Sequence, residues 1–281
     1  MLLFKKVADL QKHLDGLRRQ GQTIGFAPTM GALHDGHLEL IRMANADCDC
    51  SVASVFVNPT QFNDPKDLEK YPRTPGRDIA LLTSAGCSVL FMPPVEEVYP
   101  PGVDLSIRLD FRQLETVMEG KFRPGHFAGM ATVVNRLLDI VRPTRLYMGQ
   151  KDFQQLTIVR DMLRQLGSPI ELVMCPTVRE ADGLAMSSRN VRLTPEMRKA
   201  APQIYQTLLW AKAEFRSRPA SEVRREALRK LEAAGFRPEY FDIVDGTSLL
   251  PVGHFAEGDF PVACVALFAG EVRLIDNLPL T

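Results

Sequence analysis

Short runs of consecutive apolar residues alternate with stretches of helical periodicity along most of the chain. The apolar runs predict buried strands at residues 23–27, 51–59, 88–94, 145–148 and 170–178. Between them, apolar residues at helical spacing predict helices at about residues 4–17, 36–47, 77–85, 131–141 and 152–166. Alternating strands and helices are typical of a right-handed, mostly parallel sheet with helices on both faces. We therefore expect an α/β fold, with a doubly wound, Rossmann-like domain over residues 1–177.

The pattern changes after residue 193. Helices predicted at residues 195–215 and 222–234 precede strand-like segments at residues 240–246, 262–270 and 271–278. A short Ala-Gly turn joins the last two segments, which favours an antiparallel hairpin. We expect residues 178–281 to form a smaller α+β domain that can close over the site. Less regular stretches predict a surface loop at residues 61–78, a short strand at residues 104–110 and a helix at about residues 113–119.

Two histidines lie at the first junction between a strand and a helix. Pro28, Thr29 and Gly31 are expected to end the strand, and the helix begins at about Gly36. His34 and His37 are therefore placed near a helix N-terminus, where backbone N–H groups and the helix dipole favour a phosphate. A purely structural hydrogen-bonding role for each histidine is the simpler alternative. A metal site is disfavoured, because two histidines lack a nearby third ligand.

Polar side chains also follow later strands, and the carboxyl ends of parallel strands form the edge where open α/β sheets bind ligands. These residues are Asn58 and Gln61, then Gly149, Lys151, Asp152 and Gln155, and finally Ser187, Ser188 and Arg189. A lysine can meet a phosphate as a mobile charge, a carboxylate suits ribose hydroxyls, and a loop with serines and an arginine can close over a polyphosphate. Ordinary surface roles remain open for each group: a solvated ion pair, two exposed amides, or a helix cap beside a surface arginine.

The composition is that of a globular protein, with 45% hydrophobic and 24% charged residues among 281. Basic and acidic residues balance at 34 each, which gives no reason to expect non-specific binding to nucleic acid or membranes. The N-terminal segment lacks a signal-peptide core, and no apolar run is long enough to span a bilayer, so we expect a cytoplasmic protein. The five cysteines are scattered without paired spacing, and we interpret them as buried free thiols.

Several motifs identify the chain more closely. They are PTMGALHDGH (residues 28–37), FVNPTQF (56–62), YPRTPGRD (71–78), GQKDFQQL (149–156) and PTVREADGLAMSSRN (176–190). In this order they closely resemble the pantothenate synthetase (pantoate–β-alanine ligase) family, which belongs to the HxGH nucleotidyltransferase superfamily. The resemblance covers essentially the whole chain.

The resemblance implies a ligase of pantothenate biosynthesis that condenses pantoate with β-alanine. ATP and pantoate first give pantoyl adenylate and pyrophosphate, and the amine of β-alanine then displaces AMP. Mg²⁺ is expected to enter on the ATP phosphates without protein ligands, since phosphate oxygens suit this hard cation. The family further implies a homodimer. From the balanced charge we expect neither a nucleic acid nor a membrane as partner.

The resemblance also assigns roles to individual residues. ATP binding falls on Met30, Gly31, Ala32, Leu33, His34, Asp35, Gly36, His37, Gly149, Gln150, Lys151, Asp152, Val178, Met186, Ser187, Ser188 and Arg189. The catalytic residues among them are His34, His37, Lys151, Ser187, Ser188 and Arg189, with His37 a candidate proton donor to pyrophosphate. Substrate binding falls on Met30, Asn58, Gln61, Tyr71, Arg123 and Gln155, and Glu119 lines or supports the pocket. Ala128 takes a position where some members of the family carry an arginine.

Two other hypotheses are compatible with a nucleotide site. A nucleotidyltransferase would leave its product adenylylated even when an amine is supplied. A non-catalytic nucleotide sensor or RNA-binding module is the third hypothesis, although RNA binding is poorly supported by the zero net charge.

Overall fold

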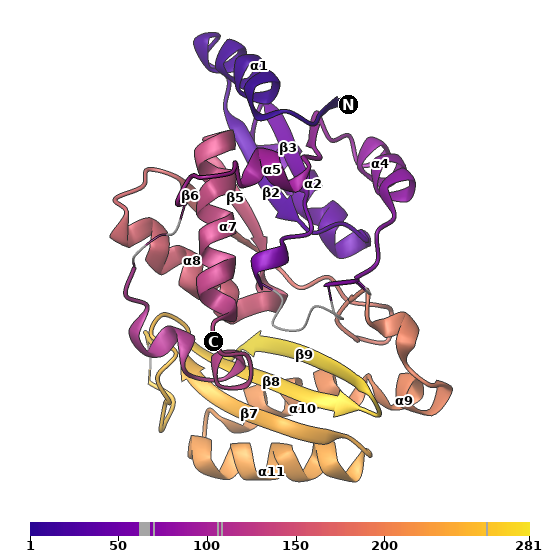
Figure 1. Ribbon diagram of the computed structural model, residues 1–281. Coiled ribbons are helices and arrows are strands. Elements are labelled where there is room, and N and C mark those ends of the chain that lie inside the picture. Colours follow the sequence, from indigo (N-terminus) through magenta and orange to yellow (C-terminus); the bar gives the residue numbers. More distant parts are fainter. Residues whose placement is uncertain (62–67, 70, 106, 108, 257) are drawn as a thin grey trace. The chain divides into compact units, whose positions relative to one another are not determined.

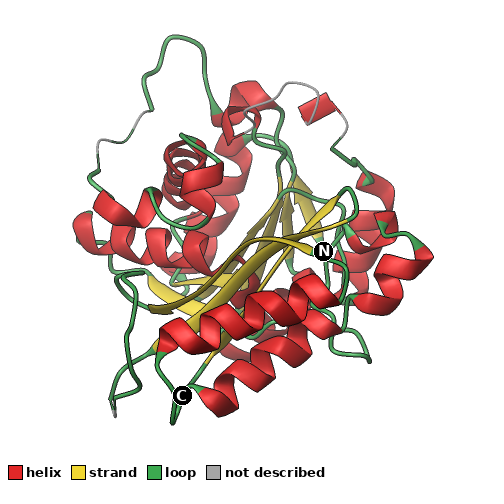
Figure 2. Ribbon diagram, turned by 90° about the horizontal axis from the view of Figure 1, so that it is seen from below, coloured by secondary structure: helices red, strands yellow, loops and turns green. Residues whose placement is uncertain are grey.

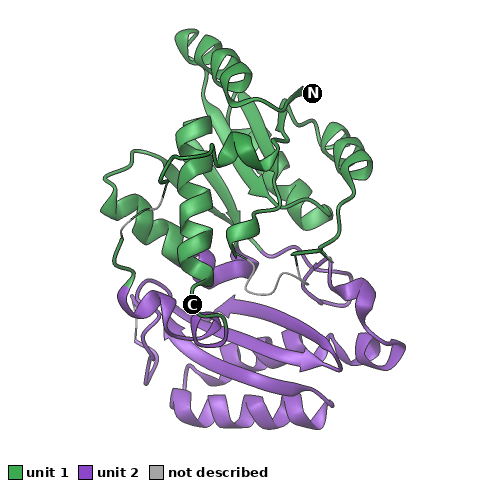
Figure 3. Cartoon of the chain, in the orientation of Figure 1, with its two compact units in different colours: residues 1–111, 123–149, 158–176 green, residues 112–122, 150–157, 177–281 purple. Residues whose placement is uncertain are grey.

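A computed structural model describes residues 1–61, 68–69, 71–105, 107, 109–256 and 258–281. The chain divides into two compact units, which Figure 3 distinguishes by colour. Unit 1 contains residues 1–111, 123–149 and 158–176, and unit 2 contains residues 112–122, 150–157 and 177–281. Unit 2 thus takes up two short segments besides the C-terminal stretch. The domain limits at residues 177 and 178 stay a prediction.

Unit 1 is built on a six-stranded sheet in which all pairs are parallel, in the order β1-β4-β3-β2-β5-β6. The strands are β1 (Leu2–Phe4), β2 (Ile24–Thr29), β3 (Cys50–Val55), β4 (Val89–Phe91), β5 (Arg145–Gly149) and β6 (Glu171–Cys175). The predicted parallel α/β fold is confirmed. The edge strand β1 was missed, because three residues are too few to carry a periodic signal.

Helices cover both faces of this sheet. They are α1 (Val7–Arg19), α2 (Asp35–Asp47), α4 (Pro75–Ser84), α5 (Val95–Val98), α7 (His126–Val141) and α8 (Phe153–Gln165). In Figure 1, α7 and α2 lie on opposite faces of the strands. Gly25 lets α2 approach β2, because a Cβ at this position would lie 3.0 Å from the Ala44 Cβ and 3.0 Å from the Tyr147 ring.

Pro28 does not end its strand as the sequence suggested. Strand β2 continues to Thr29, and Pro28 pairs with Ser54 of β3. On its other side β2 pairs with β5 only at Gly25 and Phe26. The missing N–H of Pro28 is therefore tolerated, because the ladder on that side has already ended.

Unit 2 contains a three-stranded antiparallel sheet in the order β7-β8-β9. Its strands are β7 (Arg237–Asp245), β8 (Pro261–Ala269) and β9 (Val272–Pro279), and the β8–β9 hairpin confirms the prediction. Three helices precede this sheet in the chain: α9 (Pro195–Ala200), α10 (Gln203–Glu214) and α11 (Ala220–Ala233). Helices α10 and α11 lie side by side against the sheet, as Figure 2 shows. Their buried core includes Leu208, Leu231, Phe241, Val265 and Leu267.

Three expected elements differ in the structure. The single helix at residues 195–215 is divided into α9 and α10, because Pro202 has no N–H with which to continue the helix. The helix at residues 113–119 is replaced by a 3₁₀ turn η2 (Arg112–Glu115) and a short helix α6 (Glu119–Phe122). The described residues of the segment 104–110 form no strand, and residues 106 and 108 lie outside the described part of the chain.

The remaining 3₁₀ turns are η1 (Pro59–Gln61), η3 (Gln150–Asp152) and η4 (Asn190–Arg192). Of the expected loop at residues 61–78, residues 62–67 and 70 are outside the described part, and Pro75 already begins α4. Among the described residues, no helix combines the length and the apolar character needed to cross a bilayer.

Candidate active site

The strands of unit 1 end at a common edge where the strand order reverses. Thr29 of β2 lies beside Val55 of β3, and Gly149 of β5 lies beside Cys175 of β6. Strand β2 itself lies between β3 and β5. Open α/β sheets bind ligands at such a reversal, outside the carboxyl ends of the strands. The histidine-containing turn begins directly after β2.

A buried aspartate holds this turn in place. The Asp78 side chain, from the first turn of α4, is only 1% exposed. Its carboxylate accepts the backbone N–H groups of Ala32 at 3.1 Å and Leu33 at 2.9 Å, and the Thr74 hydroxyl at 3.2 Å. The turn needs a glycine at Gly31, where φ is +82° and an added Cβ would lie 3.0 Å from Asp78 Oδ2. Asp78 was not among the predicted site residues, although it lies in one of the quoted motifs.

Helix α2 begins at the two histidines. The His34 backbone N–H donates to Nδ1 of His37 at 3.3 Å, and the two rings lie 4.0 Å apart between centroids. Because Nδ1 accepts, a neutral His37 carries its proton on Nε2 and can donate it. Within the described turn, the backbone N–H groups of Asp35 and Gly36 are the first of the helix and have no intrahelical acceptor. The helix dipole and these donors favour an anion at this point.

Three predicted substrate-binding residues lie together in unit 1. The Gln61 side-chain amide donates to the Met30 sulfur at 3.0 Å, and its Oε1 accepts from Asn58 at 3.1 Å. Asn58 is 1% exposed, and its Oδ1 accepts from the Tyr99 hydroxyl at 2.9 Å. Burial raises the pKa of the Tyr99 phenol, which keeps this group protonated as a donor. The backbone carbonyl of Gln61 also lies 3.1 Å from Nδ1 of His126.

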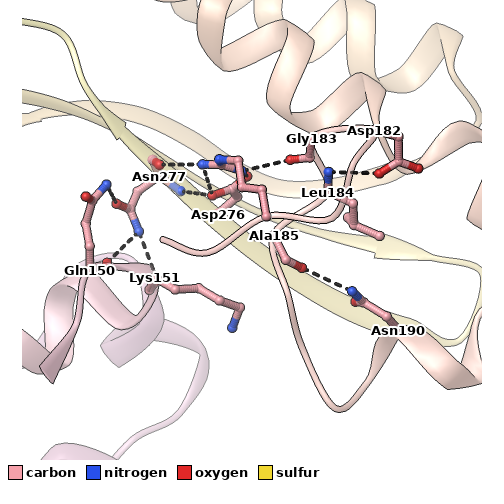
Figure 4. Close-up of polar contacts among 10 residues, drawn as sticks. Gln150, Lys151, Asp182, Gly183, Leu184, Ala185, Asn190, Asp276 and Asn277 are labelled. Atoms are coloured by element: carbon pink, nitrogen blue, oxygen red, sulfur yellow. Dashed lines mark hydrogen bonds and ion pairs between the residues drawn. The ribbon is translucent and has the colours of Figure 1, made fainter. Parts of the chain in front are cut away.

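In unit 2, the turn η3 that carries Lys151 is fixed by β9. Asn277 donates to the backbone carbonyls of Gln150 and Lys151, both at 2.9 Å, and accepts from the Gln150 side chain at 3.1 Å. Figure 4 shows these contacts, with the Lys151 side chain extending away from them. Gln150, one of the predicted ATP-binding residues, is buried within this network.

The predicted polar loop at residues 179–190 begins within a tight hairpin of unit 2 that starts at Val178. The Met186 N–H donates to the Val178 carbonyl at 2.9 Å, so these two predicted ATP-binding residues lie opposite each other. Arg179 and Ala185 form the next bridge. Beyond the hairpin, the Ser187 hydroxyl accepts from the Arg189 backbone N–H at 3.2 Å.

The other predicted residues differ in their exposure. Tyr71, Arg123, Gln155 and Ser188 are half-buried, and Asp152 is exposed. Glu119 is held by Arg273 at 2.6 and 2.8 Å and by the Tyr240 hydroxyl at 2.8 Å, all within unit 2. In the part of the chain that the structure describes, no group of three or more His, Cys, Asp and Glu side chains is placed to hold a metal ion.

Comparisons with known proteins show the family of the chain. The family model "Pantoate-beta-alanine ligase" matches residues 2–279. Pantothenate synthetases from Phocaeicola vulgatus and Porphyromonas gingivalis are each 49% identical to the chain, over 99% of both sequences. The crystal structure of pantothenate synthetase from Thermus thermophilus has a TM-score of 0.91 at 45% identity, covering 100% of this chain and 99% of that one.

A second solved structure is that of pantoate–β-alanine ligase from Francisella tularensis, complexed with beta-gamma ATP and β-alanine. Its TM-score is 0.80 at 35% identity, and the match covers 100% of this chain and 98% of that one.

Proposed function

The chain belongs to the pantoate–β-alanine ligase family and is an enzyme that joins pantoate to β-alanine, and we propose that it does so in two steps, the first of which consumes ATP. In the first step, a carboxylate oxygen of pantoate attacks the α-phosphorus of ATP, and pyrophosphate leaves. In the second, the β-alanine amine attacks the acyl carbon of pantoyl adenylate, and AMP leaves with the bonding electron pair. The amine loses a proton, and the product is pantothenate.

One observation carries this proposal: the two histidines at the start of α2 beside the backbone N–H groups of Asp35 and Gly36. Such an array favours the negative charge that grows on pyrophosphate as the bond to the α-phosphorus breaks. His37 presents Nε2–H as a proton donor to this leaving group, because its Nδ1 accepts from His34. The Francisella relative, described with beta-gamma ATP and β-alanine, supports ATP as a co-substrate here.

Further roles follow from chemistry and family membership. Lys151, Ser187, Ser188 and Arg189 stabilise charge around the α-phosphate, while Gly149 and Asp152 hold the ribose. Met30, Gln61 and Gln155 bind pantoate, with the Met30 thioether against the methyl groups. Uncharged amides suit this task, since a carboxylate in their place would repel the pantoate carboxylate and the ATP phosphates.

Two features of the proposed enzyme concern its partners. ATP would bring Mg²⁺ on its phosphate oxygens, and the ion would supply positive charge that offsets theirs. The enzyme works as a homodimer, as its family membership suggests.

Product analysis tests the reaction. With ATP, Mg²⁺, pantoate and β-alanine, the protein should release AMP and pyrophosphate in equal amounts. Without β-alanine, it should still exchange labelled pyrophosphate into ATP in a pantoate-dependent manner. No AMP from the folded protein would refute the proposal, and a stable adenylylated product in the presence of β-alanine would identify a nucleotidyltransferase instead.

His37→Ala tests the assigned proton donor. We expect pyrophosphate exchange to fall by about 10²- to 10⁴-fold, the usual range for general acid catalysis, with little change in thermal stability. His13→Ala is a matched control, because His13 is a half-buried histidine that stacks on Phe4 at 5.3 Å between ring centroids. Normal exchange in His37→Ala, or equal losses in both variants, would contradict the assignment.

A further inference from the structure

Strand β9 carries two consecutive buried polar residues that the proposed reaction does not use. Asp276 is 4% exposed and Asn277 is 2% exposed. Buried polar groups are costly unless they are hydrogen-bonded, so their partners indicate why they are there. Both residues bond to segments of unit 2 that are assigned to ATP binding (Figure 4).

Asn277 fixes the turn that carries Lys151. Its Nδ2 donates to two successive backbone carbonyls, those of Gln150 and Lys151, both at 2.9 Å. Its Oδ1 accepts from the side chain of Gln150 at 3.1 Å. The carboxamide therefore uses both donors and an acceptor on one 3₁₀ turn. The backbone of Lys151 is thus held by Asn277, and its side chain extends away from these contacts.

Asp276 fixes the hairpin that leads to Ser187. Its carboxylate accepts from Arg179 at 2.7 and 3.0 Å in a bidentate pair, and from the Asn277 backbone N–H at 2.8 Å. Arg179 also donates to the Gly183 carbonyl at 3.1 Å and stacks on the Tyr205 ring at 3.7 Å from its centroid. The guanidinium thus spans the hairpin from its first strand to its turn. A planar fork suits this task better than a point charge.

We propose that Asp276 and Asn277 are positioning residues that hold two ATP-binding segments on one strand of unit 2. Adjacent residues alternate in direction along a strand, so one dipeptide reaches two different segments. Asn277 acts through Lys151, and Asp276 acts through Arg179 on Val178, Met186 and Ser187. The inference rests on the proposed function, because it concerns how the ATP-binding residues are aligned.

Asn277→Asp removes the two donors at almost constant volume. The new carboxylate faces the carbonyl oxygens of Gln150 and Lys151 at the distance of the former hydrogen bonds, so the turn must move away. A displacement of about 1 Å near a reacting group costs on the order of 100-fold in rate. We expect kcat/KM for ATP to fall by this amount in pyrophosphate exchange, with a raised KM for ATP. The KM for β-alanine, measured in the complete reaction by release of AMP, should be unchanged.

Asn45→Asp is the control for the loss of the same kind of contact, at an exposed position. Asn45 makes the same contact on α2, since its Nδ2 donates to the successive carbonyls of Ala85 and Gly86 at 3.0 and 3.3 Å. Asn45 lies outside every segment assigned to ATP, so its variant should keep the KM for ATP. Asn277→Ser provides a second test without a new charge, for the case that Asn277→Asp fails to fold.

The kinetic pattern separates positioning from general stability. A purely structural role lowers the folded fraction, which reduces kcat for all substrates alike and leaves each KM unchanged. A normal KM for ATP in Asn277→Asp or, if that variant does not fold, in Asn277→Ser would overturn the inference. If the unmodified protein shows no pantoate-dependent exchange, the proposed function itself has failed, which is a different result.

Discussion

Asp78 places a buried carboxylate under the turn after β2, and Asp78→Asn tests whether this charge builds the phosphate site. Its Oδ1 accepts from Leu33 and Thr74, and its Oδ2 accepts from Ala32 at 3.1 Å. An asparagine can retain the oxygen on the Leu33 side. Its NH₂ group then faces the Ala32 N–H, so two donors oppose each other in a buried place.

The magnitude follows from these contacts. A hydrogen bond to a charged group contributes about 1.5–3 kcal/mol, and a buried donor left unsatisfied costs about 1–3 kcal/mol. The two terms overlap at Ala32, and we expect the free energy of unfolding to fall by about 3 kcal/mol. Because the same N–H groups precede His34, the turn should also loosen, and the KM for ATP should rise in the molecules that remain folded.

Denaturant unfolding and pyrophosphate exchange measure the two effects. Asp49→Asn is the control, since Asp49 accepts from the Thr23 N–H at 2.8 Å and the Thr23 hydroxyl at 2.7 Å but is exposed to solvent. Loss of a solvent-exposed acceptor should change stability little and leave the KM for ATP unchanged. The reasoning is refuted if Asp78→Asn behaves like Asp49→Asn in both assays.

Two further predictions concern packing and pH. In Gly129→Ala the new Cβ would lie 2.6 Å from the Thr60 carbonyl oxygen, so η1 must shift. We expect the free energy of unfolding to fall by about 1–3 kcal/mol and the KM for pantoate to rise. Gly16→Ala is the control, because Gly16 also lies in a helix and no atom lies within 4 Å of an added Cβ. Its free energy of unfolding should rise slightly. Burial raises the pKa of the Cys87 thiol from 9.0 to about 11, so its contribution to stability is complete below pH 9 and is lost as the pH rises through about 11. The free energy of unfolding should therefore fall by about 3 kcal/mol over this range, and a Cys87→Ala variant that kept the same slope would contradict this assignment.

The strands and helices of unit 1 were predictable because their signal is local. A run such as residues 51–55 has apolar or small residues on both faces, which indicates a strand covered by helices on both sides. The errors arose where a neighbouring element decides the outcome. Pro28 stays within β2 because β5 no longer pairs there, and no feature of residues 23–29 reports where β5 stops.

In the predicted site, too, local features could be predicted and contacts between distant segments could not. His34 and His37 could be placed at a helix start from spacing alone, and the structure confirms that helix at Asp35. Asp78 could have been suspected as an acid in the first turn of a helix that follows Thr74 and a proline, but only the fold shows that it faces the turn at Ala32. Asn277 gives no local signal, since its partners Gln150 and Lys151 are more than a hundred residues away in sequence.

In both units a buried side chain forms hydrogen bonds to the backbone of a turn that is assigned to ATP binding. A turn that offers some of its backbone groups to a ligand must satisfy the others within the protein, because a buried unpaired group costs free energy. In unit 1 the inward groups are N–H donors, at Ala32 and Leu33, and the partner is an acid, Asp78. In unit 2 the inward groups are carbonyls, and the partner is the amide donor of Asn277. Since the N–H groups of Ala32 and Leu33 are already engaged, we expect a phosphate at α2 to be bound by the later donors, which are the N–H groups of Asp35 and Gly36 and the two imidazoles. The helix start, and not the glycine turn, should then contact the ligand.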